Sequence, residues 1–358
     1  MVGTNEELKN RIAITYSNRT HPHRLRQLLD RYPSATEAIA RFPEMVDSKA
    51  MQHADEEIAF IEHHQIQTFY YHDSDYPYRL AQCIDAPLLL YAKGNINVNP
   101  KHIVSIVGTR MPSERGKDWC RQFVLELAQQ IPDITIVSGL AYGIDITAHR
   151  AALEANVPTL IIPAHGLDRI YPNIHRNVAI NALEKGGIIT EYTCGTEPER
   201  YNFVARNRII AGMADALIVV ESKAKGGSLI TADMAINYDR DVFACPGRPT
   251  DITAAGCNQL IKKLQAQLIE NANDLITAMQ WKTTIKPTQT SLVELTYNLN
   301  ETQNTILKLL RTADEGMHIN QIVMETQLPY NDISSELIVM ELQDIVKSLP
   351  GGIWRAIR

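Results

Sequence analysis

The chain has 358 residues, of which 45% are hydrophobic and 21% charged, and its formal net charge is −6 at pH 7. These values are typical of a globular protein of two or three domains, and they exclude disordered, collagen-like and low-complexity chains. The acidic balance also excludes a uniformly basic surface, so any site for a polyanion must be local, built from placed arginines and helix N-termini.

The sequence predicts a cytoplasmic protein with no membrane partner. It has no run of about 18 uncharged apolar residues, and its first ten residues carry acidic side chains where a signal peptide needs an apolar core. The cysteines are odd in number, lie far apart and form no C-x-x-C pair, so we expect no disulfide, no metal site and no cofactor tied to one; they are Cys83, Cys120, Cys194, Cys245 and Cys257.

The first third of the chain divides into a helical part and an approach to a sheet. Residues 1–75 are polar, with apolar positions at helical spacing, and they predict a small helical module. Residues 86–91 form an apolar run closed by Gly94, which predicts a strand leading into the central region.

The central region, residues 76–280, predicts an α/β domain with a doubly wound parallel sheet. Short apolar runs alternate there with amphipathic helical stretches, and helices are expected to open at Ser113, Gly143 and Gly226. The predicted strands are Ile103–Val107, Ile134–Val137, Thr159–Ile162, Ile188–Thr190, Ala216–Val220 and Val242–Cys245.

Residues 281–300 lack periodicity and predict a linker, after which residues 301–358 predict a winged helix. The expected elements are helices over 302–310, 320–326 and 333–345, a turn over 328–332, and two strands over 346–349 and 353–357 around Gly351-Gly352. Acidic residues lie on or near the expected recognition helix, so we expect this domain to bind protein, or little at all, rather than duplex DNA.

The first loop of the predicted sheet, Gly108-Thr109-Arg110 before Ser113, follows a strand and precedes a helix. Gly108 permits close backbone approach, and Arg110 is able to hydrogen-bond a phosphate with two N–H groups. The alternative is an ordinary turn with a surface arginine.

The second loop contains Ser138, Gly139 and Gly143, without a G-x-G-x-x-G pattern or a Walker lysine. Asp145 and His149 share a helix face, where they would bind a metal, act as an acid–base pair with Ser138, or simply hydrogen-bond to each other. We favour the hydrogen bond because no third metal ligand is evident.

Two further loops supply cations and glycines at the same sheet edge. Tyr171 either stacks on a base or turns the chain with Pro172, and Arg206 and Arg208 are either ligand contacts or salt-bridging arginines. Gly226-Gly227-Ser228, next to Lys223 and Lys225, forms either an anion site or a flexible loop. Because such loops share one edge of a doubly wound sheet, together they predict a binding crevice.

Several ordered strings resemble the DNA-processing protein A (DprA/Smf) family. They include Ile106–Arg110, Val137–Asp145 with Ala148-His149, Tyr171-Pro172, Thr190–Tyr192, Ala205–Gly212, Gly227–Ala232 and Val242–Gly247. The resemblance implies an extended Rossmann domain between a helical, SAM-like N-terminal module and a winged helix. It further implies a protein without established catalysis that binds and protects incoming single-stranded DNA and loads the recombinase RecA during natural transformation.

At residue level the resemblance implies a DNA groove and a homodimer. The groove would include Gly108, Thr109, Arg110, Ser138, Gly139, Arg176, Arg206, Arg208, Gly226, Gly227 and Ser228, and the dimer interface would include Cys257, Asn258, Leu260 and Ile261. Two positions depart from the family pattern: His175 replaces an asparagine, and Leu264-Gln265 replaces Gly-Ala.

Two alternatives use the same loops for nucleotides. One is an enzyme similar to nucleoside-monophosphate phosphoribohydrolases, with Glu191 or Asp145 as the acid. The chain lacks their P-G-G-x-G-T-x-x-E string, because Met234 stands where the glutamate would follow the nearest match. The other is a nucleotide-sensing protein with a winged helix for interaction.

Overall fold

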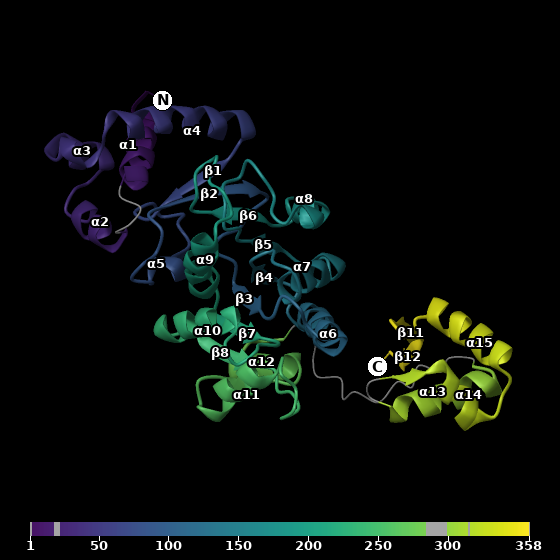
Figure 1. Cartoon of the computed structure of the whole chain (residues 1–358). Coiled ribbons are helices and arrows are strands. Elements are labelled where there is room, and N and C mark those ends of the chain that lie inside the picture. The colour runs from purple at the N-terminus through teal and green to yellow at the C-terminus, as the bar shows by residue number, and fades with distance from the viewer. Residues whose placement is uncertain (1, 18–21, 284–298, 314–315, 358) are drawn as a thin grey trace. The chain divides into compact units, whose positions relative to one another are not determined.

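The computed structural model describes residues 2–17, 22–283, 299–313 and 316–357 (Figure 1). The chain forms two compact units, residues 1–285 and residues 286–358. The first unit contains both the predicted helical module and the predicted α/β domain. The predicted linker spans the boundary between the units, and most of it, residues 284–298, lies outside the described residues.

A nine-stranded sheet forms the centre of the first unit, in the order β1-β2-β6-β5-β4-β3-β7-β8-β9. The strands from β6 to β9 in this order pair in parallel, whereas β1 and β2 add an antiparallel edge. The strands are β1 (Gln67–Tyr70), β2 (Leu89–Gly94), β3 (His102–Val107), β4 (Ile134–Ser138), β5 (Thr159–Ile161), β6 (Gly187–Thr190), β7 (Ala216–Val219), β8 (Asp241–Ala244) and β9 (Gln267–Leu268).

The six strands predicted for the central region are confirmed to within one residue, and with them the doubly wound α/β fold. Every residue of β3 is buried, as expected for a parallel strand covered on both faces. The strand predicted over 86–91 begins three residues later, at Leu89. The region predicted to be helical also contains β1, and the short edge strand β9 was not predicted.

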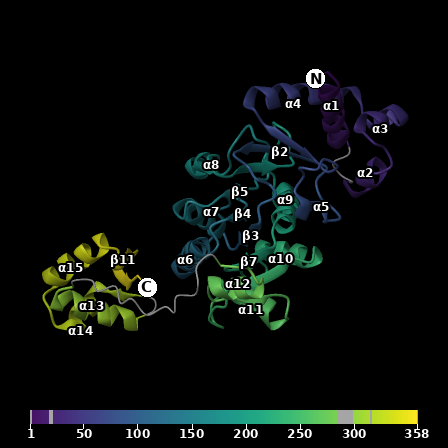
Figure 2. The ribbon, with the colours of Figure 1, turned by 180° about the vertical axis from the view of Figure 1, so that it is seen from behind.

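Helices cover both faces of the sheet (Figures 1 and 2). One face packs against α6 (Glu114–Gln130), α7 (Ile144–Glu154) and α12 (Ala272–Ala278). The other packs against α9 (Arg200–Met213) and α10 (Gly227–Asn237). The remaining helices are α8 (Arg176–Ala182), beside α7, and α11 (Ala255–Lys262), after β8.

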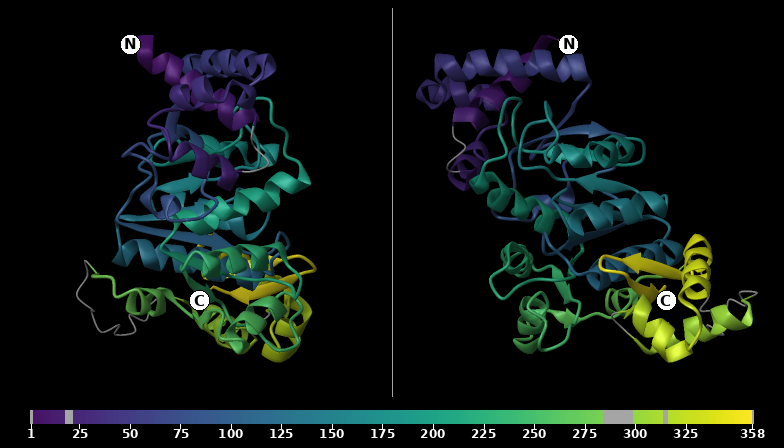
Figure 3. Two further views of the ribbon diagram at one scale, coloured as in Figure 1. Left: turned by 90° about the vertical axis from the view of Figure 1, so that its left-hand side faces the viewer. Right: turned by 45° about the vertical axis from the view of Figure 1, so that its right-hand side comes forward.

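The N-terminal helices pack around the β1–β2 end of the sheet, as Figure 3 shows in two orientations. Their apolar residues join the same core as α9 and β2, so no separate N-terminal core forms among the described residues. They are α1 (Val2–Ser17), α2 (Pro22–Leu29), α3 (Ala35–Arg41), the 3-10 turn Pro43–Met45, α4 (Ser48–His64) and, after β1, α5 (Tyr78–Ala81).

The strand order reverses at β3 and β7. From β3 the chain proceeds through β4, β5 and β6 on one side, and α9 then returns it to β7, which pairs with the opposite edge of β3. In open α/β sheets this reversal leaves a crevice beyond the carboxyl ends of the two strands. The fold therefore places the loops after Val107 and Val219 at the position where ligands bind.

The second unit is a winged helix, as predicted. Its helices are α13 (Glu301–Thr312), α14 (Ile319–Thr326) and α15 (Tyr330–Leu342), and its sheet has the order β10-β12-β11. The strands are β10 (Met317–His318), β11 (Val346–Leu349) and β12 (Ile353–Ala356). The helix predicted over 333–345 begins three residues earlier, because Pro329 forms its N-cap, and it ends three residues earlier, at Leu342.

None of the helices in the described ranges is long and apolar enough to cross a membrane.

Candidate nucleic-acid interface

The loop after β3 is bound tightly to the loop after β7. The Thr109 amide donates to the Glu221 carbonyl at 2.7 Å. The Ser113 amide and hydroxyl donate to the Glu221 carboxylate at 2.9 and 2.6 Å, while the Ser113 hydroxyl accepts from the Gly116 amide and so caps α6. These bonds fix the two strand ends relative to each other and leave Arg110 exposed above them.

Gly108 is required by packing rather than by a special backbone angle. A Cβ at this position would lie 2.5 Å from Cγ1 of Ile144, the first residue of α7, and 3.1 Å from the Glu221 carbonyl oxygen. The glycine therefore allows the start of α7 to approach the end of β3, which closes one wall of the crevice.

A cavity of about 290 Å³ opens at this reversal point. Four cationic side chains line it, Arg110, Arg206, Lys223 and Lys225, against one acidic side chain, Asp145. The other lining residues are Val107, Gly108, Thr109, Ala141, Phe203, Val204, Asn207, Ile210, Ser222, Gly226, Gly227, Ser228, Ile230 and Thr231. The cavity thus concentrates positive charge on a chain whose net charge is negative.

Phe203 lies between the two arginines of the cavity. The Arg110 guanidinium carbon is 5.3 Å from the centre of the Phe203 ring, and that of Arg206 is 5.9 Å from it. The exposed Tyr171 ring extends the row, with its centre 5.9 Å from that of Phe203. A cation and flat aromatic surfaces at one opening can hold a phosphate and an adjacent base together.

Arg206 is buried under the cavity floor. It donates to the carbonyl oxygens of Gly139 and Ile162, and it lies near the carboxylate of Asp145. Burial lowers the pKa of Arg206 to about 10, so the guanidinium remains charged at neutral pH. Because it is only 3% exposed, its positive charge acts on a ligand through the field rather than through direct contact.

Asp145 and His149 bond separate partners, so the hydrogen bond predicted between them is wrong. Asp145 accepts from the Gly139 and Ala141 amides at 3.2 and 3.3 Å, and burial raises its pKa. The His149 Nδ1 atom is 2.7 Å from the Thr159 hydroxyl oxygen, and burial lowers the pKa of this imidazole to about 3. Both side chains hold α7 to the sheet.

The predicted groove residues separate into those that reach the cavity and those that do not. Gly108, Thr109, Arg110, Gly226, Gly227 and Ser228 line it, with Arg206. Ser138 and Gly139 lie beneath: the buried Ser138 hydroxyl donates to the Ile106 carbonyl at 2.6 Å, and the Gly139 carbonyl accepts from Arg206. Arg176 is exposed at the start of α8, outside the residues that line the cavity.

Arg208 is directed away from the cavity. Its guanidinium donates to the Asp85 carbonyl at 2.7 Å and pairs with Glu191. Consecutive residues of a helix are about 100° apart around its axis, so residues 206 and 208 face nearly opposite sides. Arg208 therefore makes structural contacts within the first unit, and its contact with DNA stays a prediction.

The predicted dimer segment is largely internal. Cys257 and Leu260 are buried in the core of the subunit, and Ile261 packs partly against the same core. The Asn258 side chain exchanges two hydrogen bonds with the Gly247 backbone. Within the single chain the side chains of Cys257 and Leu260 are thus covered, and the interface predicted around them stays a prediction.

Sequence reasoning did not single out Phe203 as a ligand contact. Its position was detectable, because residues 203, 206, 207 and 210 recur at helical spacing and all line the cavity. The different surroundings of Arg208 on the same helix were not distinguishable without the fold.

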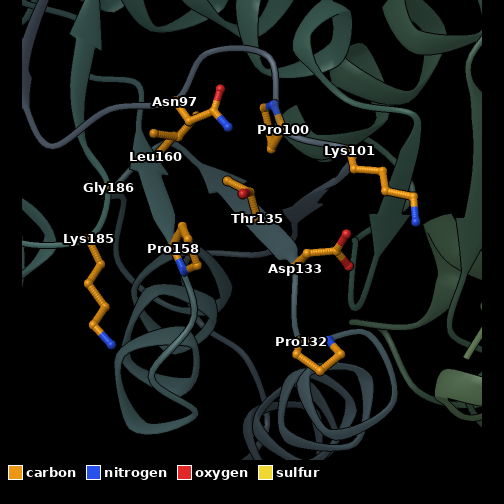
Figure 4. Close-up of a pocket in the computed structure, with 10 residues that line it drawn as sticks. All are labelled: Asn97, Pro100, Lys101, Pro132, Asp133, Thr135, Pro158, Leu160, Lys185 and Gly186. Carbon is orange, nitrogen blue, oxygen red and sulfur yellow. The ribbon is translucent and has the colours of Figure 1, made fainter. Parts of the chain in front are cut away.

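A second cavity, of about 350 Å³, lies near the amino ends of β3, β4 and β5 (Figure 4). It is lined by Asn97, Pro100, Lys101, Pro132, Asp133, Thr135, Pro158, Leu160, Lys185 and Gly186. Its two lysines stand on opposite sides in Figure 4, and the Lys185 ammonium donates to the Asn156 side chain. It has two lysines and one aspartate, whereas four cationic side chains line the first cavity.

No group of His, Cys, Asp and Glu side chains suited to a metal ion occurs among the residues that the structure describes. The fold defines a doubly wound α/β protein joined to a winged helix, with a cavity lined by four cationic side chains at the reversal point of the sheet. This chain belongs to the DNA recombination-mediator protein A family, whose model matches residues 67–280, and the model of the DprA winged helix domain matches residues 292–352.

Relatives extend over most of the chain. It is 34% identical to the protein Smf of Synechocystis over 326 residues, which cover 82% of this chain and 81% of the relative. It is 37% identical to the DNA processing protein DprA of Streptococcus pneumoniae over 209 residues, or 58% and 73% of the two chains.

Two solved structures support the same assignment. The X-ray structure of the Streptococcus pneumoniae DNA processing protein A matches with a TM-score of 0.60 and 29% identity, covering 77% of this chain and 96% of that one. A structure of the Helicobacter pylori protein, described for its single-stranded DNA binding mode, matches with a TM-score of 0.55 and 31% identity over 61% and 97% of the chains.

Proposed function

We propose that this protein binds single-stranded DNA in the cavity between the carboxyl ends of β3 and β7. The observation that carries the proposal is a cavity lined by four cationic side chains, in which Arg110 lies near the ring of Phe203 and the exposed Tyr171 ring lies next to Phe203. The Helicobacter pylori relative, whose structure concerns its mode of binding single-stranded DNA, supports it.

Phosphates and bases would use different parts of the site. The exposed side chains of Arg110, Lys223 and Lys225 would contact phosphates, together with the backbone amide of Gly227 at the start of α10. Unstacked bases would stack on Phe203 and Tyr171, whose rings accept any base. Binding would therefore be tolerant of sequence and would discriminate against duplex DNA, whose bases are already stacked.

For other residues that the sequence predicts in the groove, we propose either direct contact with DNA or support of the cavity floor. Arg176, exposed on α8, would contact the strand where it leaves the cavity. Ser138, Gly139 and Arg206 would support the floor, because Arg206 holds the backbone of β4 and β5 together.

We further propose a cytoplasmic homodimer that protects incoming single-stranded DNA and loads RecA onto it during natural transformation. The family assignment supports this role. Near α11 the exposed apolar side chains are Ile252, Leu264 and Leu268, at 74%, 92% and 48% exposure. These residues, rather than Cys257 and Leu260, would form the contact between two copies.

We propose that the protein is not an enzyme. The phosphoribohydrolase alternative needs an acid in the cavity, and Glu191 is paired with Arg208 instead. Asp145 does line the cavity, but its Oδ2 atom accepts from two backbone amides, those of Gly139 and Ala141. A thermal-shift measurement separates the hypotheses: oligo-dT should raise the melting temperature, and AMP, ADP and NAD should not. A shift with a nucleotide alone would favour the enzyme or the nucleotide sensor.

Paired lysine variants test whether DNA binds at this edge of the sheet. Lys223→Ala/Lys225→Ala should weaken oligo-dT binding, because two cations leave the proposed site. Lys101→Ala/Lys185→Ala removes the same charge from the second cavity and should leave binding unchanged. Equal effects of the two pairs would show a non-specific charge effect and contradict the site.

RecA loading is tested on single-stranded DNA coated with single-strand-binding protein. Wild type should shorten the delay before RecA begins to hydrolyse ATP, and Arg110→Ala should not. If oligo-dT binds normally but the delay is unchanged by wild type, DNA binding stands and the loading role is wrong.

A further inference from the structure

The helix α15 presents an apolar surface on the side that faces away from its own domain core. Ile333, Leu337 and Met340 are buried on the core side. The opposite side of the helix carries Ile338, Val339 and Leu342, which are 51%, 40% and 82% exposed. We call these three residues the α15 apolar face. Exposed apolar side chains that lie together on one face are typical of binding surfaces, because burying them against a partner stabilises the complex.

The position of this face is the one at which winged-helix proteins usually contact the DNA major groove, but its chemistry does not suit DNA. The sequence of α15, YNDISSELIVMEL, contains no lysine, arginine or histidine. Proteins that bind duplex DNA neutralise phosphates with lysine and arginine. Phosphates near α15 would instead meet Asp332 and Glu341, and Asp344 two residues after the end of the helix.

The negative charge beside the apolar face is fixed by the fold. The Glu341 carboxylate accepts from the hydroxyl and the amide of Ser348 on β11, at 2.5 and 2.8 Å. These two bonds lower the pKa of Glu341, which keeps its charge at neutral pH. Asp332 and Asp344 are exposed at the two ends of the helix. An apolar surface with carboxylates around it is complementary to an apolar surface with cations around it.

We propose that the α15 apolar face binds a cationic amphipathic segment of another protein. Apolar side chains of that segment would cover Ile338, Val339 and Leu342, and its lysines or arginines would lie opposite Asp332, Glu341 and Asp344. Burial supplies the affinity, and the charges select the partner and raise the association rate at low salt. This interaction does not depend on the DNA site in the first unit.

The test uses the full chain and a labelled helical peptide made only of leucine and lysine, with its leucines on one face. Fluorescence anisotropy should show saturable binding that weakens with salt. Ile338→Ser/Leu342→Ser should weaken it about tenfold or more, since two buried apolar contacts are lost. The matched control Ile84→Ser/Met324→Ser removes two apolar side chains that are also exposed, one in the first unit and one on α14, and should change the affinity less than about twofold.

Peptide controls separate the apolar and the charged parts of the interaction. A peptide with glutamate in place of lysine, and a peptide with the same composition but no apolar face, should both bind poorly. Equal binding of the scrambled peptide, or equal loss in both double variants, would overturn the proposal. Circular dichroism verifies that the variants, whose changes are on the surface, remain folded.

Two other occupants of the face, duplex DNA and a second copy of the chain, are tested with the same double variant. If duplex DNA binds the full chain and Ile338→Ser/Leu342→Ser removes that binding, α15 reads DNA and the proposal is wrong. If sedimentation shows self-association that the same variant abolishes, the occupant is a second copy and the proposal is wrong. We expect neither result.

Discussion

Glu57 provides a test of how the N-terminal helices are coupled to the loops beside the cavity. Its carboxylate, buried on α4, accepts from the Cys194 amide at 3.2 and 2.9 Å. The next amide, that of Gly195, donates to the Asp168 carboxylate at 3.0 Å, so Glu57 and Asp168 bind two consecutive amides of the loop after β6. The pKa of Glu57 is raised from 4.5 to about 7, mainly by burial, with a smaller contribution in the same direction from nearby Asp168, while the hydrogen bond from the Cys194 amide opposes the shift.

The sign of the pH effect follows from this raised pKa. Between the unfolded pKa of 4.5 and the folded pKa of about 7, the folded state binds more protons than the unfolded state. The free energy of unfolding therefore falls as the pH rises through this window, and it levels off above it. A pKa shift of this size changes the free energy of unfolding by at most about 3 kcal/mol across this pH window.

Glu57→Gln should remove this dependence, because the neutral amide oxygen still accepts from Cys194. The variant should match wild type near pH 5 and be more stable than wild type near pH 8, by up to about 3 kcal/mol. Urea unfolding in a Trp354→Phe background, where Trp119 and Trp281 report on the first unit, measures the difference. Glu56→Gln, on the exposed side of the same helix, is the control. Parallel pH profiles for wild type and Glu57→Gln would refute the reasoning.

Three further substitutions test the first unit. Arg79→Ala should lower the free energy of unfolding in urea by about 3–5 kcal/mol, because the buried Arg79 guanidinium donates to both carboxylate oxygens of Asp215, at 2.6 and 2.9 Å. A loss of less than about 1 kcal/mol would show that water replaces this ion pair. Phe203→Ala should weaken oligo-dT binding by about 1–3 kcal/mol while Phe203→Tyr retains it, and equal affinities for all three proteins would remove the ring from the site. Gly108→Ala should destabilise wild type by about 1–3 kcal/mol and should cost less in an Ile144→Ala background, where the clash is removed; an equal cost in both backgrounds would mean that the clash with Ile144 is not the cause.

The strands of the central sheet were predictable because burial on both faces requires continuous apolar runs, and loop residues bound each run. The short edge strands were not, since Gln67–Tyr70 is only half buried and Gln267–Leu268 is exposed, so neither carries that pattern. The start of α15 was placed too late because Pro329 was interpreted as part of a turn, whereas it precedes the first helical residue.

The sequence also located the edge of the sheet that carries the cavity, because glycines and cations follow several strands. It did not distinguish residues that reach the cavity from those beneath or behind it. Arg206 and Arg208 have the same side chain and similar surroundings in sequence, yet helical rotation directs one to the cavity floor and the other to Glu191. Cys257 and Leu260 likewise become internal only once α11 packs on β7 and β8.

The central claim is that Arg110 and its neighbours bind single-stranded DNA. The most direct test is the anisotropy of labelled oligo-dT, and of its duplex with oligo-dA, titrated with wild type, Arg110→Ala and the exposed control Arg150→Ala at several salt concentrations. We expect tight oligo-dT binding, weak duplex binding, and a loss of about ten- to a hundredfold in Arg110→Ala alone, with the log–log salt slope reduced by about 0.7 for the lost phosphate contact. Equal affinity for duplex and single strand, or an unchanged affinity in Arg110→Ala, would contradict the account.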